Sequence, residues 1–115
     1  METGNAIRLV EGDANVVYTI TVKRGGAVED LSGKTVTLYA RDESSAGASN
    51  QVDGAAFTFT GDGSDGEGAV TFTAAHCTLA SGKDLKGWWR LKIVDGADVE
   101  WSKRATFIIE RNGMA

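Results

Sequence analysis

GWWRLKIVDG (residues 87–96) is the stretch that decides the fold. Its apolar residues alternate with charged ones, and an Asp-Gly pair closes it. Successive side chains on a β-strand point to opposite faces, so one set is expected to face a core. The inward set is Trp89, Leu91 and Ile93, and the outward set is Trp88, Arg90 and Lys92. The stretch predicts an antiparallel strand that turns back in a tight hairpin at Asp95-Gly96.

The same alternation recurs along the chain. Six further stretches alternate β-branched or aromatic residues with polar ones: 5–12, 15–26, 35–41, 55–63, 68–75 and 98–112. Between them lie segments rich in glycine, aspartate, asparagine and serine, which form turns in this proline-free chain. We therefore predict an all-β, immunoglobulin-like sandwich of about seven strands in two antiparallel sheets. One domain, 1–115, is expected, with its core at about 5–110 and a mobile loop at about 43–54.

Finer predictions concern the last third of the chain. One helical turn is expected within 73–82, with Leu79 closing the end of the core. In 98–112 the alternation assigns one set inward (Val99, Trp101, Ala105, Phe107 and Ile109) and another outward (Glu100, Ser102, Arg104, Thr106 and Ile108). Lys103 falls on the inward side, so a β-bulge is expected nearby. The first strand (5–10) and the final strand (98–110) are predicted to be sheet edges.

Composition and charge narrow the function classes. The net charge of −4 and the pI of about 4.9 are not those of most nucleic-acid-binding proteins. A local basic cluster, interpreted as a solvated strand face, comprises Lys83, Lys86, Arg90 and Lys92. Cys77 is the only cysteine, which excludes an intramolecular disulfide and fits folding in a reducing cytoplasm. We expect a soluble protein with neither a signal peptide nor a membrane span.

The residues most able to carry chemistry show no pattern for it. His76, the only histidine, adjoins Cys77, and adjacent side chains point apart, so a Cys–His nucleophilic pair is geometrically poor. The acidic stretch GDGSDGEG (61–68) lacks the ligand spacing of a calcium loop and is interpreted as a soluble turn. We therefore expect no metal, no cofactor and no enzymatic activity.

The outward aromatic residues offer a contact surface. If Trp89 is buried, its neighbour Trp88 must face out beside Arg90. Tryptophan and arginine are enriched at binding hot spots, which favours a protein interface. An outward tryptophan equally suits a platform for a sugar ring. A third alternative is that Arg90 and Lys92 simply cover the Trp88 ring.

Several short motifs follow one another in a familiar order. Gly12-Asp13 precedes a strand, D-L-S-G-x-T-V spans 30–36, G-x-V-T-F opens 68–75, and the last hairpin closes with T-F-I-I at 106–109. Over about residues 11–110 the chain resembles small immunoglobulin-like phage proteins, above all the N-terminal domain of phage upper baseplate proteins and related tail-fibre attachment modules. It departs from that pattern in its long 43–54 segment and in Ala105, where the family often has glycine.

The resemblance implies a non-enzymatic virion structural protein of a tail, baseplate or head surface, made in the bacterial cytoplasm. We expect it to dock to other phage structural subunits and to form a symmetric homo-oligomer, without binding nucleic acid or a membrane. The residues expected at the interface are Trp88, Arg90, Arg104, Ile108 and Tyr39. The alternative is a carbohydrate- or receptor-binding sandwich with Trp88, Tyr39 or Trp101 as the stacking platform; a secreted host domain is a third class.

Overall fold

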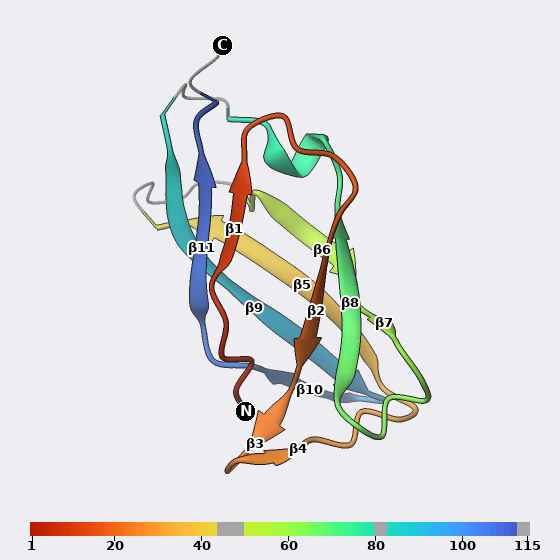
Figure 1. Cartoon of the computed structure of the whole chain (residues 1–115). Coiled ribbons are helices and arrows are strands. Elements are labelled where there is room, and N and C mark those ends of the chain that lie inside the picture. The colour runs from red at the N-terminus through yellow and green to blue at the C-terminus, as the bar shows by residue number, and fades with distance from the viewer. Residues whose placement is uncertain (44–49, 80–82, 113–115) are drawn as a thin grey trace.

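The computed structural model describes residues 1–43, 50–79 and 83–112, and it is an all-β sandwich, which confirms the predicted fold class (Figure 1). The strands in chain order are β1 (Ile7–Val10), β2 (Val16–Thr21), β3 (Lys23–Arg24), β4 (Ala27–Val28), β5 (Thr35–Asp42), β6 (Val52–Ala56), β7 (Thr58–Phe59), β8 (Glu67–Phe72), β9 (Leu85–Asp95), β10 (Asp98–Trp101) and β11 (Ala105–Glu110). Within these ranges the helical element is a 3₁₀ turn, η1 (Ala75–Cys77), inside the segment predicted to contain a helical turn. No helix of the described part has the length and apolar character needed to cross a bilayer.

Two sheets face each other across the core (Figure 1). The larger has six strands in the order β1-β11-β9-β5-β6, with β10 also paired to β9. The smaller has the order β2-β8-β7, and β3 and β4 form a separate hairpin. The pairs are antiparallel except β1–β11, which is parallel. Among the described strands, none packs over the outer face of the larger sheet (Figure 1).

Period-2 alternation places most side chains as predicted. Trp89 is fully buried on β9, whereas its neighbour Trp88 is only partly covered. The largest buried side chains come from both sheets: Trp89, Leu38, Leu91 and Phe107 from the larger, and Phe72 and Val70 from the smaller. Removal of apolar surface from water contributes roughly 25 cal/mol per Å², so these inner faces hold the two sheets together.

The stretch 98–112 forms two strands rather than one. Both β10 and β11 pair with β9, but Trp101 lies opposite Lys92 whereas Ala105 lies opposite Trp89. The three residues between Trp101 and Ala105 therefore face the two between Trp89 and Lys92. One extra residue on one strand is a β-bulge, so the bulge predicted in this region is confirmed.

Because of the bulge, the side chains before it point to the sheet face opposite to the predicted one. The predicted inward positions of Val99 and Trp101 and the outward position of Ser102 are wrong, because Val99 and Trp101 are exposed and Ser102 is buried. The Ser102 hydroxyl accepts a hydrogen bond from the Leu91 N–H at 2.8 Å, and the Ser102 N–H donates to the Leu91 carbonyl at 2.9 Å. Beyond the bulge, Phe107 faces inward as predicted.

The prediction of a mobile loop at 43–54 is wrong over its last part. β6 begins at Val52, whose side chain is fully buried, and it pairs with β5. The register of that pair shifts opposite Gly54, which has φ +84°, and a side chain there would meet the Tyr39 hydroxyl at 3.3 Å. Glycine thus leaves room for Tyr39 on the outer face. Residues 44–49 lie outside the described part of the chain.

Side chains close the edge at β1. The Arg8 N–H donates to the Tyr18 hydroxyl at 3.1 Å, and that hydroxyl donates to the Arg8 carbonyl at 2.6 Å. The Val10 N–H donates to the Asp13 carboxylate at 2.9 Å. β1 is an edge strand as predicted, but its exposed backbone groups are already paired. The second predicted edge is wrong for β11, which lies between β1 and β9; β10 pairs with β9 alone among the described strands.

The D-L-S-G motif forms a turn that anchors a core residue. Asp30 Oδ1 accepts hydrogen bonds from the hydroxyl and the N–H of Ser32, and both lower the pKa of Asp30. Leu31 is fully buried, and its N–H donates to the Gly63 carbonyl at 2.8 Å. The motif therefore ties the turn after β4 to the turn between β7 and β8.

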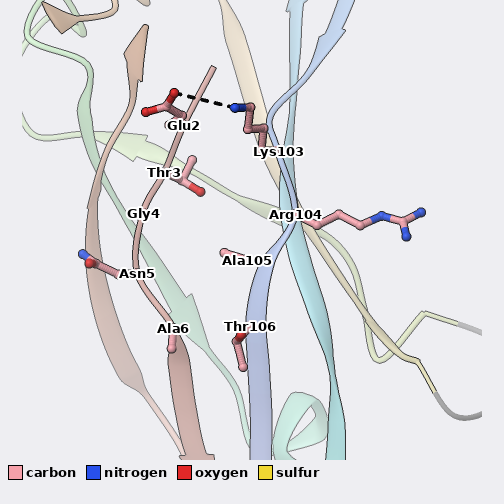
Figure 2. A pocket seen from close by; sticks show the side chains of 9 residues that line it. All are labelled: Glu2, Thr3, Gly4, Asn5, Ala6, Lys103, Arg104, Ala105 and Thr106. Atoms are coloured by element: carbon pink, nitrogen blue, oxygen red, sulfur yellow. Dashed lines mark ion pairs between the residues drawn. The ribbon is translucent and has the colours of Figure 1, made fainter. Parts of the chain in front are cut away.

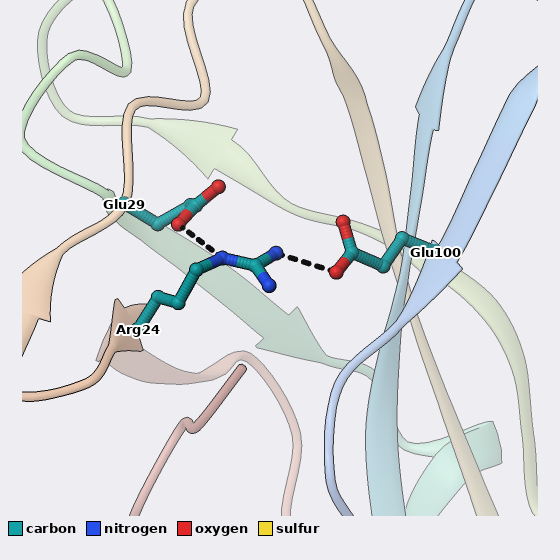
Figure 3. Close-up of polar contacts among 3 residues, drawn as sticks. All are labelled: Arg24, Glu29 and Glu100. Atoms are coloured by element: carbon teal, nitrogen blue, oxygen red, sulfur yellow. Dashed lines mark hydrogen bonds and ion pairs between the residues drawn. The ribbon is translucent and has the colours of Figure 1, made fainter.

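An arginine joins the β3–β4 hairpin to the larger sheet (Figure 3). Arg24 Nε lies 3.0 Å from a Glu29 carboxylate oxygen, and its Nη2 donates to Glu100 of β10. Hydrogen bonding with Glu100 and then Glu29 raises the pKa of Arg24, and Arg24 lowers the pKa of Glu100. Because Arg24 and Glu100 are half exposed, this ion-pair cluster contributes little to stability.

Candidate docking surface

The outer face of the larger sheet brings most of the predicted interface residues together. Trp88 and Arg90 project from β9, and Tyr39 projects from β5, because these positions alternate with buried residues. Arg104 extends from the bulge before β11 and contacts Trp88. Ile108 lies on the same face of β11, further along the strand, and is half-buried.

Four side chains form an alternating series of cations and rings, here called the cation–aromatic ladder: Arg104, Trp88, Arg90 and Trp101. The Arg104 guanidinium carbon lies 4.2 Å from the centre of the Trp88 ring. The guanidinium carbon of Arg90 lies 5.1 Å from the Trp88 ring and 4.1 Å from the Trp101 ring. Cations within about 6 Å of a ring centre are attracted to its face, typically by about 0.5–1 kcal/mol at an exposed site. The ladder therefore holds two long arginine side chains in place.

Two further side chains extend the ladder at Trp101. Lys92 Nζ lies 5.8 Å from the centre of this ring, and the Tyr39 ring packs edge-on against it with centroids 5.5 Å apart. Trp101 nevertheless stays 39% exposed, so part of its ring is open to solvent. The outer face thus combines aromatic area with positive charge across β5, β9 and β10.

The sequence prediction of an interface missed Lys92 and the neighbourhood of Trp101. That prediction applied a single inward–outward alternation to both β10 and β11, without a shift at the bulge. It therefore placed Trp101 in the core. The position of Trp101 could have been predicted from the hairpin at Asp95-Gly96. Its two-residue loop pairs Asp95 with Asp98, and counting back along both strands sets Trp101 opposite Lys92 on the outer face.

Arg90 is the most enclosed cation of the ladder. Its Nε atom is buried and has no hydrogen-bond partner among the described residues. Burial, and secondarily the charge of Arg104, lower the pKa of Arg90. Since arginine stays protonated in proteins, the chain holds a partly desolvated charge whose contacts within the ladder are the indole rings.

The residues considered for catalysis or metal binding serve the fold. His76 Nδ1 accepts a hydrogen bond from the Thr73 N–H at 3.1 Å, and burial lowers the pKa of His76. Cys77 is fully buried, and burial raises the pKa of its thiol. The Asp62 carboxylate accepts hydrogen bonds from the N–H and hydroxyl of Ser64, as in a side-chain-stabilised turn. In residues 1–43, 50–79 and 83–112, no group of three or more His, Cys, Asp or Glu side chains is arranged to share a metal ion.

An open cleft of about 460 Å³ lies between the N-terminal segment and the start of β11 (Figure 2). Glu2 and Lys103 stand at its rim with their charged atoms 3.8 Å apart, and the Arg104 side chain points away from them. Thr3 is buried, and its hydroxyl has no hydrogen-bond partner among the described residues. The cleft joins two segments distant in sequence.

The fold and the ladder define the chain as a small β-sandwich domain with cations on one sheet face. No protein-family model and no curated protein sequence matches it. Among solved structures it is similar to the N-terminal domain of phage TP901-1 ORF48, with a TM-score of 0.58 and 10% sequence identity. The match covers 92% of this chain and 85% of that one. The predicted resemblance to such a phage domain is therefore confirmed at the level of the fold.

Proposed function

We propose that this chain is a non-enzymatic structural protein of a phage virion that acts as a protein–protein docking module. The observation that carries the proposal is the fold shared with the ORF48 domain of phage TP901-1 over nearly the whole length of both domains. The protein is made in the bacterial cytoplasm and becomes part of a tail, a baseplate or a head surface.

Docking uses the outer face of the larger sheet. Trp88, Arg90 and Arg104 form the centre of the contact, with Tyr39 and Ile108 beside them. Tryptophan and arginine dominate binding energy at many interfaces. The ladder fixes their rotamers before binding, so less side-chain entropy is lost when a partner arrives.

The partners are other structural subunits of the same particle. The chain itself forms a homo-oligomer with cyclic symmetry, as most closed oligomers do. Light scattering across a concentration series measures its mass. A single monomeric mass at all concentrations would contradict the homo-oligomer.

Incorporation into particles tests docking directly. The double variant Trp88→Ala/Arg104→Ala should fold but fail to enter virus-like particles, measured by quantitative mass spectrometry of purified particles. The matched control is Val17→Ala/Val28→Ala, which truncates exposed side chains of the smaller sheet and the β3–β4 hairpin. Equal incorporation of the ladder variant and wild type would rule out this face as the docking surface.

A carbohydrate-binding function is the second candidate, and the exposed part of Trp101 favours it. A sugar ring needs an open aromatic face, whereas Arg90 and Lys92 both lie over Trp101. The ladder geometry therefore supports protein docking more strongly. Binding on a glycan array that disappears in Trp101→Ala would reverse this order.

A further inference from the structure

The cations of the ladder have no carboxylate partner within the described part of their own chain. The ion pairs there include those of Arg24 and Lys103. Arg90, Lys92 and Arg104 take part in none of them, and Arg90 and Arg104 are close enough for the charge of one to affect the other. The outer face therefore holds positive charge that carboxylates from outside the chain would neutralise.

Charge is divided unevenly between this face and the rest of the molecule. The chain has a net charge of −4, yet strand register and ladder contacts place half of its basic residues on the outer face of the larger sheet: Arg8, Arg41, Lys86, Arg90, Lys92 and Arg104. The same registers place few acidic residues there, namely Asp53 and Glu110, and Glu43 lies at the edge of this face beside Trp88 and Arg104. The other surfaces carry most of the acidic residues.

This division argues against a symmetric self-contact through the ladder. In a two-fold dimer the same patch of both copies meets itself. Such a contact would bring Arg90 and Arg104 of one copy towards the same residues of the other. Juxtaposed like charges at an interface are strongly unfavourable. A two-fold homodimer of this chain is therefore not expected to form through the ladder, which leaves this face for a surface of opposite charge.

We infer that this face docks an acidic surface of another protein, whose carboxylates bind the guanidinium groups of Arg90 and Arg104 and the ammonium group of Lys92. The inference rests on the proposed docking function and specifies the chemistry of its partner. Guanidinium groups bind carboxylates in a planar, two-pronged geometry. Because the indole rings already hold both guanidinium groups, the partner meets charges that are oriented in advance.

The geometry of the ladder favours binding of carboxylate groups over stacking of nucleobase or sugar rings. Recognition of single-stranded nucleic acid or of a sugar relies on stacking against an open aromatic face. Here a cation lies over Trp88 and over Trp101. A stacking ligand would have to displace that cation, whereas a carboxylate adds to it and leaves the ring contact in place.

Two polyanions of equal charge separate these ligand classes: poly-L-glutamate and an oligothymidylate. Isothermal titration calorimetry of the full chain at low salt should show binding of poly-L-glutamate that weakens as salt is added, and weaker binding of the oligothymidylate. No binding of poly-L-glutamate at low salt, or tighter binding of the oligothymidylate, would overturn the inference.

Matched variants locate the binding on the ladder. Arg90→Gln/Arg104→Gln should weaken poly-L-glutamate binding at least about tenfold. The control Lys23→Gln/Lys34→Gln removes the same charge away from this face and should weaken it clearly less. Arg104→Gln alone, at an exposed position, provides a second test with less risk to folding. Equal losses in ladder and control variants would overturn the inference.

The docking function and the acidic partner can fail separately. Suppose that Arg90→Gln/Arg104→Gln is excluded from particles but wild type does not bind poly-L-glutamate. The docking role of this face is then supported, and the inference of an acidic partner is wrong. If wild type binds poly-L-glutamate through the ladder but the variant still enters particles, the acid preference stands and the docking role of this face is wrong.

Discussion

Trp88 and Trp89 are neighbours on one strand, yet they belong to two different regions of the molecule. Trp89 is fully buried in the core, and its indole N–H donates to the Asn5 carbonyl at 3.0 Å. Trp88 lies on the outer face, partly covered by Arg90 and Arg104. Burial and a satisfied donor make Trp89 a structural residue, whereas Trp88 is held by cations and stays accessible. The inner face of β9 therefore stabilises the fold, whereas its outer face positions the arginine side chains of the ladder.

The largest expected effect separates the two tryptophans directly. Trp89→Ala leaves a cavity and an unpaired Asn5 carbonyl, and truncation of a buried tryptophan typically costs about 3–5 kcal/mol. Trp88→Ala should cost much less because Trp88 lies outside the core. Denaturant unfolding followed by circular dichroism measures both free energies. A greater loss in Trp88→Ala would mean that the faces of β9 are reversed.

The second-largest effect is expected at Ser102, in the β-bulge where the inward–outward alternation of side chains shifts by one residue. Ser102→Ala removes the buried hydroxyl that accepts the Leu91 N–H, and an unsatisfied buried donor costs about 1–3 kcal/mol. Thr106→Ala, at an exposed position of β11, is the control and should change stability little. The same unfolding measurement compares them. If the two variants were equally stable, the bulge would not depend on the Ser102 hydroxyl.

The third effect asks whether the ladder contributes to folding. Arg90→Met keeps an unbranched side chain but removes the buried Nε that lacks a partner. Loss of that desolvated group should offset loss of the ring contacts, so the free energy of unfolding should stay within about 1 kcal/mol of wild type. Thermal unfolding provides the measurement. Destabilisation comparable to that of Trp89→Ala would make Arg90 a structural residue rather than a contact residue.

The smallest effect concerns the ion pair between Arg24 of the β3–β4 hairpin and Glu100 of β10. Arg24 lowers the pKa of Glu100 in the folded state below its ordinary value of 4.5. A depressed folded pKa stabilises the protein above the unfolded value, and this contribution is lost as the pH falls below it towards the folded pKa. The melting temperature of wild type should therefore approach that of Glu100→Gln as the pH decreases. A constant difference at every pH would show that the pair does not stabilise the fold.

Much of the fold follows from the sequence because a strand with one buried face must alternate. The period-2 pattern of β9 was sufficient to assign Trp89 and Leu91 to the core, and the same pattern identified β1, β2, β5 and β8. Glycine and aspartate marked the turns because few other residues adopt turn conformations at low cost. The D-L-S-G motif likewise corresponds to a turn around the buried Leu31.

The site was harder to predict because it depends on pairing between strands. Alternation placed Trp88 and Arg90 outward, but it could not show that Arg104 would reach Trp88 from another strand. The prediction also continued the same inward–outward alternation through the bulge, and so it assigned the exposed Trp101 to the core. A single inserted residue leaves little trace in a hydrophobic pattern, since its effect appears only when two strands are set in register.

By itself the sequence determined the all-β class, the inward and outward sets of β9 and the turn positions, because these depend on local backbone geometry and on burying one face of each strand. Only the tertiary structure decided that β1 pairs in parallel with β11 and that β10 brings Trp101 beside Arg90 and Tyr39. Those outcomes depend on hydrogen-bond register between segments far apart in the chain. The ladder exists because that register gathers cations and indole rings from β9, β10 and the bulge on one face.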